Sequence, residues 1–206
     1  MENKISEKRS LISIIKANLK IIFLILISIL IVFFIYLWFD YASDNKKTEL
    51  SEKFIDAKIL LTKKKQDKAL NVLEKIIEEK DNTYSVLSLY LIIDNDLIND
   101  NNKILNYFDT ILSISSLKKE DKNLINLKKA IFLSNFVKEQ ELLKLLNPII
   151  NSNSVWRVQA TKFLADYYFS IDENIKANQY YSILLQLNDP NIDRGDIRSK
   201  MQKLKK

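Results

Sequence analysis

The acidic run DNDLINDNN at residues 94–102 has the side-chain types that could bind calcium, because Asp and Asn supply oxygen ligands. An EF-hand loop needs oxygen ligands at its positions 1, 3 and 5, a glycine at position 6 and a bidentate glutamate at position 12. With Asp94 as the first position, the fifth is Ile98 and the sixth is Asn99. This spacing excludes an EF-hand loop, and the run is interpreted as a turn between two helices.

The chain contains no cysteine and no histidine. Thiolate nucleophiles, imidazole base catalysis and Cys/His zinc sites are therefore excluded. The single glycine, Gly195, cannot build a glycine-rich phosphate-binding loop, which needs several positions without a Cβ. The carboxylates after residue 39 mostly alternate with lysines, as on solvated helix faces. We expect a protein that is not an enzyme and that uses no cofactor or metal ion.

Charge is unevenly distributed along the chain. Residues 1–20 carry five basic and two acidic side chains, which is half of the formal net charge of +6. The rest of the chain is nearly balanced, whereas a nucleic-acid-binding domain concentrates basic residues to neutralise phosphates. We expect no nucleic-acid partner.

Residues 21–39, IIFLILISILIVFFIYLWF, contain no charged side chain and neither glycine nor proline. As a helix the segment would be about 28 Å long, close to the hydrocarbon thickness of a bilayer. A secretory signal has a shorter apolar region and a small-x-small cleavage site. Here the run ends in aromatic residues, among them Tyr36 and Trp38, which suit the membrane interface. The segment is predicted to be an uncleaved, single transmembrane anchor that contacts lipid.

The flanks of this segment predict its orientation. Positive residues such as Lys16 and Lys20 precede it, whereas Asp40 and Asp44 follow it. Positively charged flanks remain in the cytoplasm. We therefore expect a bacterial inner-membrane protein with a basic cytoplasmic stub at 1–20, the anchor at 21–39 and a periplasmic domain at 40–206.

From Thr48 onward, apolar residues recur at intervals of three and four, which is typical of amphipathic helices. No strand is required, so the fold class is all-α. Ser154 and Asn191 are expected to cap helices. Helices are expected near 47–63, 66–79, 82–95, 102–114, 119–135, 138–150, 154–170, 173–187 and 191–204.

Short helices joined by short turns suggest stacked hairpins, and small residues recur at helix positions that would suit such packing. Ala177 follows Ala165 by twelve residues, and Ala69 follows Ala57 by the same interval. This spacing resembles the tetratricopeptide repeat, an α-solenoid whose stacked hairpins form one core and a concave protein-binding surface. We expect about four hairpins and a C-terminal capping helix. The residues expected to pack the repeats are Ala57, Ala69, Ala130, Leu164, Ala165, Tyr168, Ala177 and Tyr181.

The whole pattern resembles the ancillary subunit family of the SecYEG translocon, the YfgM-like tetratricopeptide proteins. NTY at 82–84 opens the second hairpin as in that family, and Trp156 precedes Ala165 by nine positions, as in its last repeat. The chain departs from the family at Ala165 and at Asp172, where glycine is common.

The resemblance implies a non-enzymatic scaffold in the inner membrane. It would associate with the SecYEG translocon and with a membrane-anchored prolyl-isomerase-like chaperone, and it would link secreted polypeptides to periplasmic chaperones. The alternative is a tetratricopeptide scaffold that coordinates cell-envelope assembly or cell division.

Three aromatic residues are candidates for partner binding. Trp156 is either a binding anchor or the large residue that fills the junction between the third and fourth hairpins. Tyr168 and Tyr181 fall on inward positions of the repeat. This leaves Tyr167 and Tyr180 as the candidate surface residues.

The predicted orientation can be tested by proteolysis of spheroplasts from cells that produce a doubly tagged protein. Protease added outside the inner membrane should digest residues 40–206 and leave the N-terminal tag intact, because the positive flank stays in the cytoplasm. Immunoblotting of both tags provides the measurement. A protected C-terminal tag would contradict the orientation.

Overall fold

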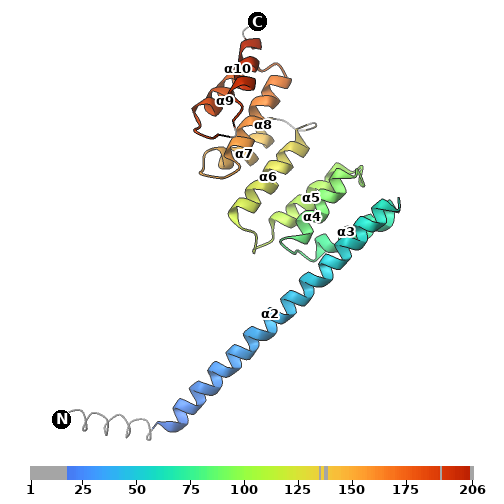
Figure 1. The fold of residues 1–206 in the computed structure, drawn as a ribbon, viewed down its shortest axis with the longest axis vertical. Coiled ribbons are helices and arrows are strands. Elements are labelled where there is room, and N and C mark those ends of the chain that lie inside the picture. Colours follow the sequence, from blue (N-terminus) through green and yellow to red (C-terminus); the bar gives the residue numbers. More distant parts are fainter. Residues whose placement is uncertain (1–17, 135, 137–138, 191, 205–206) are drawn as a thin grey trace, which may run out of the picture. The chain divides into compact units, whose positions relative to one another are not determined.

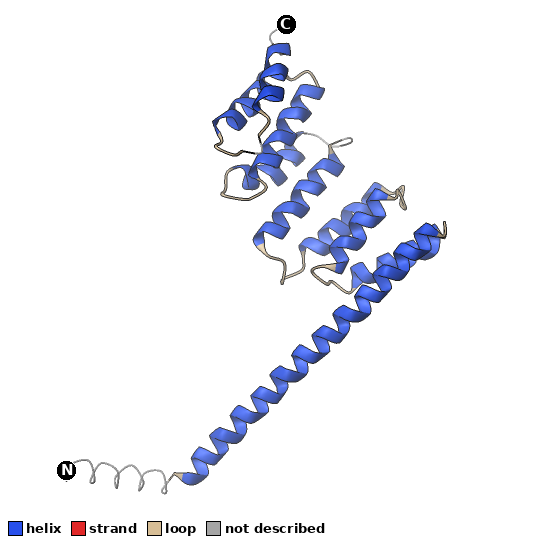
Figure 2. Ribbon diagram, in the orientation of Figure 1, coloured by secondary structure: helices blue, strands red, loops and turns tan. Residues whose placement is uncertain are grey.

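The computed structural model describes residues 18–134, 136, 139–190 and 192–204. Within these ranges every regular element is a helix, without any strand (Figures 1 and 2). The all-α class is therefore confirmed for the described residues, while most of the stub at 1–20 lies outside them. The helices are α2 (Leu19–Thr62), α3 (Gln66–Glu78), α4 (Tyr84–Asp94), α5 (Asn101–Leu112), α6 (Lys119–Leu133), α7 (Glu139–Ile150), α8 (Arg157–Ser170), α9 (Asn174–Gln186) and α10 (Arg194–Lys203).

The chain divides into two compact units, Met1–Asp56 and Ala57–Lys206. Helix α2 is continuous over 44 residues. The anchor predicted at 21–39 and the helix predicted near 47–63 therefore belong to one continuous helix. The residues between these segments include neither glycine nor proline, so nothing interrupts the helical backbone hydrogen bonds.

The first part of α2, Leu19–Trp38, is long and apolar enough to cross a membrane, and none of its most apolar window is buried in the structure. The Trp38 side chain, for example, is 77% exposed. A core helix of a soluble domain would instead bury such side chains against its neighbours. Length, composition and exposure all suit a lipid-facing segment.

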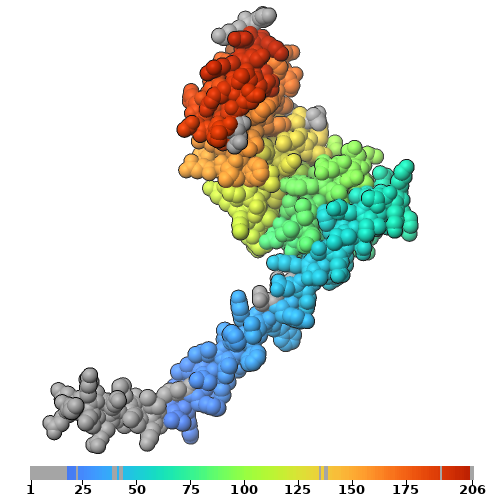
Figure 3. Space-filling model, in the orientation of Figure 1, coloured from blue at the N-terminus to red at the C-terminus, as the bar shows by residue number. Residues whose placement is uncertain are grey.

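In the second unit, each helix from α3 to α10 packs against its neighbours in the chain. The order of the helices in space thus follows their order in sequence, as the colours of this unit show in Figure 3. Contacts between such close neighbours require only short connections, in agreement with the short turns that the sequence predicts.

The small residues of this unit lie where helices meet. The side chains of Ala69, Ala130, Ala165 and Ala177 are all 0% exposed, as is that of Ala57. An alanine at a contact lets two helix backbones approach closely, because it carries only a Cβ atom. Leu164, Tyr168 and Tyr181 are buried as well.

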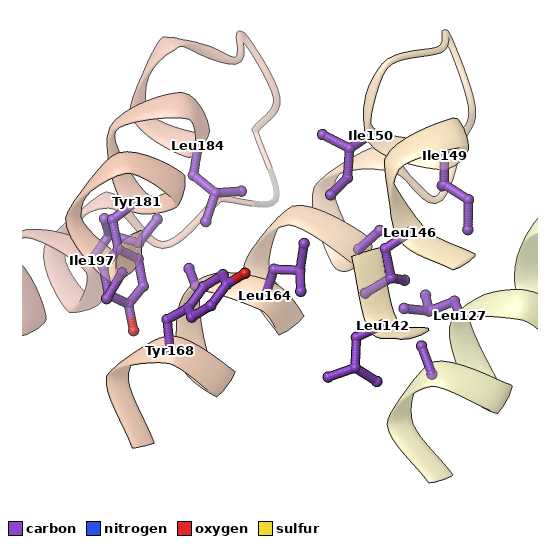
Figure 4. Packing of buried hydrophobic residues seen from close by; sticks show 14 of the residues in the cluster. Leu127, Leu142, Leu146, Ile149, Ile150, Leu164, Tyr168, Tyr181, Leu184 and Ile197 are labelled. Carbon is purple, nitrogen blue, oxygen red and sulfur yellow. The ribbon is translucent and has the colours of Figure 1, made fainter. Parts of the chain in front are cut away.

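One apolar cluster runs from α6 to α10 (Figure 4). Leu142 and Leu146 of α7 lie beside Leu127 of α6, and Tyr168 and Tyr181 lie further along the cluster. Helices α6 to α10 therefore share one core. No helix pair in this region has to bury its apolar face alone.

Several helices end in a left-handed turn without using glycine. Asp172 follows α8 with a φ of 58°, and Lys64 follows α2 with a φ of 57°. The N–H of Glu173 donates to the carbonyl of Tyr168 at 3.0 Å, the long-range hydrogen bond of a Schellman motif. Asp172 thus takes a left-handed turn conformation that glycine adopts more readily.

Helices α8 and α10 each begin three residues later than predicted. Helix α8 begins at Arg157 instead of 154, and Ser154 accepts a hydrogen bond from the Trp156 N–H at 3.2 Å. The predicted cap Asn191 lies outside the described residues. In α10 the cap is Asp193, whose carboxylate accepts a hydrogen bond from the N–H of Asp196 at 3.0 Å.

Enlarging the buried alanines should destabilise the helical unit. We expect Ala165→Leu or Ala177→Leu to lower the free energy of unfolding by about 1–3 kcal/mol, because the added atoms must enter a filled contact. Urea unfolding followed by circular dichroism provides the measurement. The matched control is Asn178→Leu at an exposed position of α9, which should change stability by less than about 0.5 kcal/mol. Equal stabilities of all three variants would contradict the packing.

Candidate functional site

The two tyrosines predicted to form a binding surface are half-buried and belong to one aromatic group. The ring of Tyr180 stacks on that of Tyr168 with 5.5 Å between centroids, and Tyr167 meets Tyr168 edge-on at the same distance. Both also pack against the apolar cluster of α6 to α10. Tyr167 and Tyr180 therefore support Tyr168, and their role in partner binding stays a prediction.

Tyr168 is the centre of a polar contact between three helices. Its hydroxyl donates to Glu139 Oε1 of α7 at 2.7 Å, and Lys176 Nζ of α9 donates to Glu139 Oε2 at 2.7 Å. The ammonium of Lys176 also lies 5.3 Å from the Tyr168 ring centroid. The hydrogen bond from Lys176, followed by that from Tyr168, lowers the pKa of Glu139.

The same combination recurs at Tyr181. Its hydroxyl donates to Asp166 Oδ1 at 2.7 Å, and Lys200 Nζ donates to the same oxygen at 2.9 Å. Burial acts to raise the pKa of Asp166, but the hydrogen bonds from Lys162, Lys200 and Tyr181 outweigh it and lower that pKa. Here the contact joins α8, α9 and α10.

A third such group lies near the start of the helical unit. Tyr107 of α5 donates to Glu74 Oε1 of α3 at 2.8 Å, and Lys103 Nζ pairs with the same oxygen at 2.7 Å. We call these three groups the Tyr–carboxylate–Lys clusters. In each cluster the pKa of the tyrosine is raised. Burial is the largest cause, and the hydrogen bond to the carboxylate is the second largest. The hydroxyls are therefore held protonated as donors, which suits a structural contact.

Trp156 lies at the junction between the third and fourth expected hairpins. Its indole Nε1 donates to the backbone carbonyl of Glu120 at 3.1 Å. Ser154 donates to Glu120 Oε2 at 2.6 Å, and this hydrogen bond is the main cause of the lowered pKa of Glu120. Trp156 is half-buried against the apolar cluster. These contacts connect the start of α6 to the turn before α8.

Two adjoining hollows lie between α4 and α6, and Tyr90 lines both of them. We call them together the α4–α6 groove. One hollow has a volume of about 210 Å³ and the other about 410 Å³. The smaller is lined by Tyr90, Ile93, Asp94, Phe108, Lys128, Ile131 and Phe132. The larger is lined by Asn82, Thr83, Val86, Leu87, Tyr90, Lys118, Asp121, Leu124 and Ile125.

Much of the groove surface is apolar. Leu87 is 40% exposed and Ile131 is 42% exposed. Phe132 contacts Phe108 with 6.0 Å between ring centroids and Phe136 with 5.2 Å. Exposed apolar groups that gather in a hollow mark interaction surfaces on soluble domains.

Tyr90 is the polar feature at the middle of the groove. Its hydroxyl oxygen is buried and has no hydrogen-bond partner among the described residues. Burial raises the pKa of this hydroxyl to about 12. Lys128 is exposed, and its Nζ lies 5.8 Å from the Tyr90 ring centroid. The hydroxyl lacks an acceptor, which costs about 1–3 kcal/mol for a buried polar group.

The groove was not predicted from the sequence, although the apolar composition of α4 indicates a possible binding surface. The helix YSVLSLYLIID is one of the shorter apolar helices in the described part of the chain. A helix that is apolar on nearly all faces buries all of them or offers one as a binding surface. Leu87 and Tyr90 lie on the face that α4 offers to the groove, whereas Leu89 and Ile92 are fully buried.

Within the described ranges, no group of three or more acidic side chains is arranged to hold a metal ion. Comparison with models of protein families, with curated proteins and with solved structures finds no match to this chain.

Acid should weaken the Tyr–carboxylate–Lys clusters. The pKa of Glu139 is lower in the folded protein than in the unfolded chain, so its contribution to stability is present above the ordinary glutamate pKa of about 4.3. That contribution is lost as the pH falls through the folded value. We expect the urea midpoint to drop between about pH 7 and pH 3, and to drop less in Glu139→Gln.

The control for this measurement is Glu141→Gln, which changes an exposed carboxylate of the same helix. It should keep the pH dependence of the parent protein. If Glu139→Gln and Glu141→Gln showed the same pH dependence as the parent, the interpretation of the Glu139 contact would be wrong.

Proposed function

We propose that this chain is a membrane-anchored, non-enzymatic scaffold whose helical unit binds other polypeptides. The observation that carries the proposal is the α4–α6 groove, where exposed apolar side chains surround a buried, unpartnered hydroxyl. Exposed apolar side chains of this kind are buried when a bound chain supplies apolar contacts.

The architecture that we propose for the helical unit is a tetratricopeptide-like solenoid of four hairpins with α10 as its cap. Two findings support it. Helices pack on their chain neighbours from α3 to α10, and the side chains of Ala57, Ala69, Ala130, Ala165 and Ala177 are fully buried. Stacked hairpins of this type leave one helix of each pair along a shared surface, which is where such proteins bind partners.

The proposed location is the bacterial inner membrane, with the helical unit in the periplasm. Support comes from the exposed, apolar Leu19–Trp38 segment and from the positive charge that precedes it. Anchoring confines the binding surface to the membrane, so that weak contacts with a membrane partner suffice. In line with the resemblance to the YfgM-like family, the proposed partners are the SecYEG translocon, a membrane-anchored chaperone and secreted polypeptides.

Site-specific photo-cross-linking in cells tests these partners. We expect a cross-linker at Trp38 to form adducts with a translocon component, and one at Leu87 to form adducts with secreted polypeptides or a chaperone. Both side chains are exposed, and Leu87 lines the groove. Val155, which is 70% exposed and outside the groove, is the matched control position and should form neither.

Mass spectrometry of the purified adducts identifies the partners. Adducts confined to cell-wall synthesis or outer-membrane assembly proteins would favour a scaffold for envelope assembly instead. Equal labelling from Leu87 and Val155 would contradict a function of the groove.

A further inference from the structure

The α4–α6 groove is long enough for a short segment of extended chain. Both α4 and α6 pack on α5. The smaller hollow joins Asp94 and Phe132, near the ends of the two helices, and the larger joins Thr83 and Lys118, near their starts. From Asn82 to Asp94 the groove follows about 18 Å of helix. An extended chain covers this length with about five or six residues.

The walls that an occupant meets are apolar in both hollows. Leu87 and Leu124 line the larger hollow, and Ile131 and Phe132 line the smaller one. The hydroxyl oxygen of Tyr90 is buried, so an occupant cannot reach it, and Tyr90 contributes to the walls through its ring. Burial of these walls favours an occupant that carries apolar side chains along the whole length of the groove.

The charged residues that line the groove balance in each hollow. The smaller hollow is lined by Asp94 and Lys128, and the larger by Asp121 and Lys118. No other charged residue of the described chain lines either hollow. Neither hollow therefore has a net charge that attracts an acid or a base. A charged side chain that entered the groove would lose hydration without a net opposite charge to compensate for it.

The folding state of the occupant follows from these requirements. Folded soluble domains bury most large apolar side chains and rarely expose a contiguous patch of them. An unfolded chain exposes apolar segments of five or six residues in an extended conformation. The chemistry of the groove therefore suits an unfolded chain better than the surface of a folded partner.

We propose that the α4–α6 groove binds uncharged, apolar segments of unfolded polypeptides and rejects acidic and basic segments alike. This rests on the proposed function, because it names the kind of polypeptide that the scaffold binds. The apolar walls supply the affinity, and the balanced charges remove any preference for one sign of charge.

Fluorescence anisotropy with the full-length protein in nanodiscs tests this selectivity. The probe is a labelled peptide of about ten residues, capped at both ends, with a central run of leucine, valine and serine. Two matched peptides carry glutamate or lysine at the central position. We expect the uncharged peptide to bind about tenfold more tightly than either charged one, because a charge in the groove loses hydration.

Single substitutions can shift the charge balance in either direction. Lys128→Met leaves the smaller hollow with Asp94 alone, and Asp94→Asn leaves it with Lys128 alone. We expect Lys128→Met to strengthen binding of the lysine peptide about threefold, and Asp94→Asn to do the same for the glutamate peptide. The matched controls are Lys144→Met and Glu141→Gln, at exposed positions of α7 outside the groove, which should change none of the three affinities.

The contribution of the apolar walls is tested by Leu87→Ser. Leu87 is exposed and lines the larger hollow, so the change removes apolar contact without opening a cavity in the core. We expect the uncharged peptide to bind this variant about fivefold more weakly. Val155→Ser, at an exposed position outside the groove, is the matched control and should bind as the parent protein does. Thermal unfolding of both variants checks that the fold is intact.

An unfolded competitor distinguishes an unfolded chain from a folded partner. We expect α-lactalbumin that is unfolded by disulfide reduction to displace the uncharged peptide, and native α-lactalbumin at the same concentration to leave it bound. The reductant does not alter the scaffold, because the chain contains no cysteine. Equal displacement by both forms would contradict selection of unfolded chains.

The outcomes separate this proposal from the broader function. Equal binding of the three peptides, or unchanged affinities in Lys128→Met and Asp94→Asn, would refute the selection by charge but leave a polypeptide-binding scaffold in place. Tightest binding of the glutamate or the lysine peptide would refute the uncharged occupant. Absence of binding by all three peptides would refute the proposal for this groove, and the cross-links from Leu87 would then decide whether the groove binds polypeptides at all.

Discussion

The structure of the helical unit depends on close contact between helices at buried alanines. Ala165 of α8 and Ala177 of α9 have no exposed surface, and Ala69 and Ala130 occupy equally buried positions in the earlier helices. At such positions, the backbones approach until larger neighbours such as Leu164 and Tyr168 fill the remaining space. Because each helix from α3 to α10 packs on its neighbours in the chain, the packing of one pair sets the position of the next.

The Tyr–carboxylate–Lys clusters add directional hydrogen bonds between helices to this apolar packing. In the cluster at Tyr168, one carboxylate on α7 accepts from a tyrosine on α8 and from a lysine on α9. The cluster at Tyr181 shifts the same pattern by one helix, from Asp166 on α8 to Lys200 on α10. Two buried tyrosines can thus keep their hydroxyls hydrogen-bonded at the margin of an apolar core, where an unpartnered group would be destabilising. Tyr90 has a buried hydroxyl but lacks such a carboxylate.

The groove and the anchor complement one another in the function that we propose. A shallow, largely apolar groove provides modest affinity, because only a few side chains of the bound segment are buried. Confinement at a membrane raises the effective concentration of nearby partners, so that modest affinity is sufficient. A continuous α2 from Leu19 to Thr62 carries both the segment that is long and apolar enough to span a membrane and the first residues of the helical unit.

Local patterns in the sequence determined the helical content and most helix positions. The interval of three and four between apolar residues depends only on the helix period, and the spacing of Ala165 and Ala177 depends only on the length of two helices and a turn. The anchor at 21–39 and the helix near 47–63 were predicted as separate segments, whereas α2 runs through both, because polar residues alone do not end a helix that lacks glycine and proline.

Only the tertiary structure decided which side chains meet. Glu139 and Tyr168 are 29 positions apart in sequence, and Lys128 reaches Tyr90 from another helix, so no local pattern indicates either contact. The predicted surface residues Tyr167 and Tyr180 were chosen from helix geometry, but the neighbouring helices half-bury both against Tyr168. A sequence specifies the apolar face of each helix through its periodicity, whereas the groove between α4 and α6 exists only because both helices pack on α5 and leave Tyr90 between them.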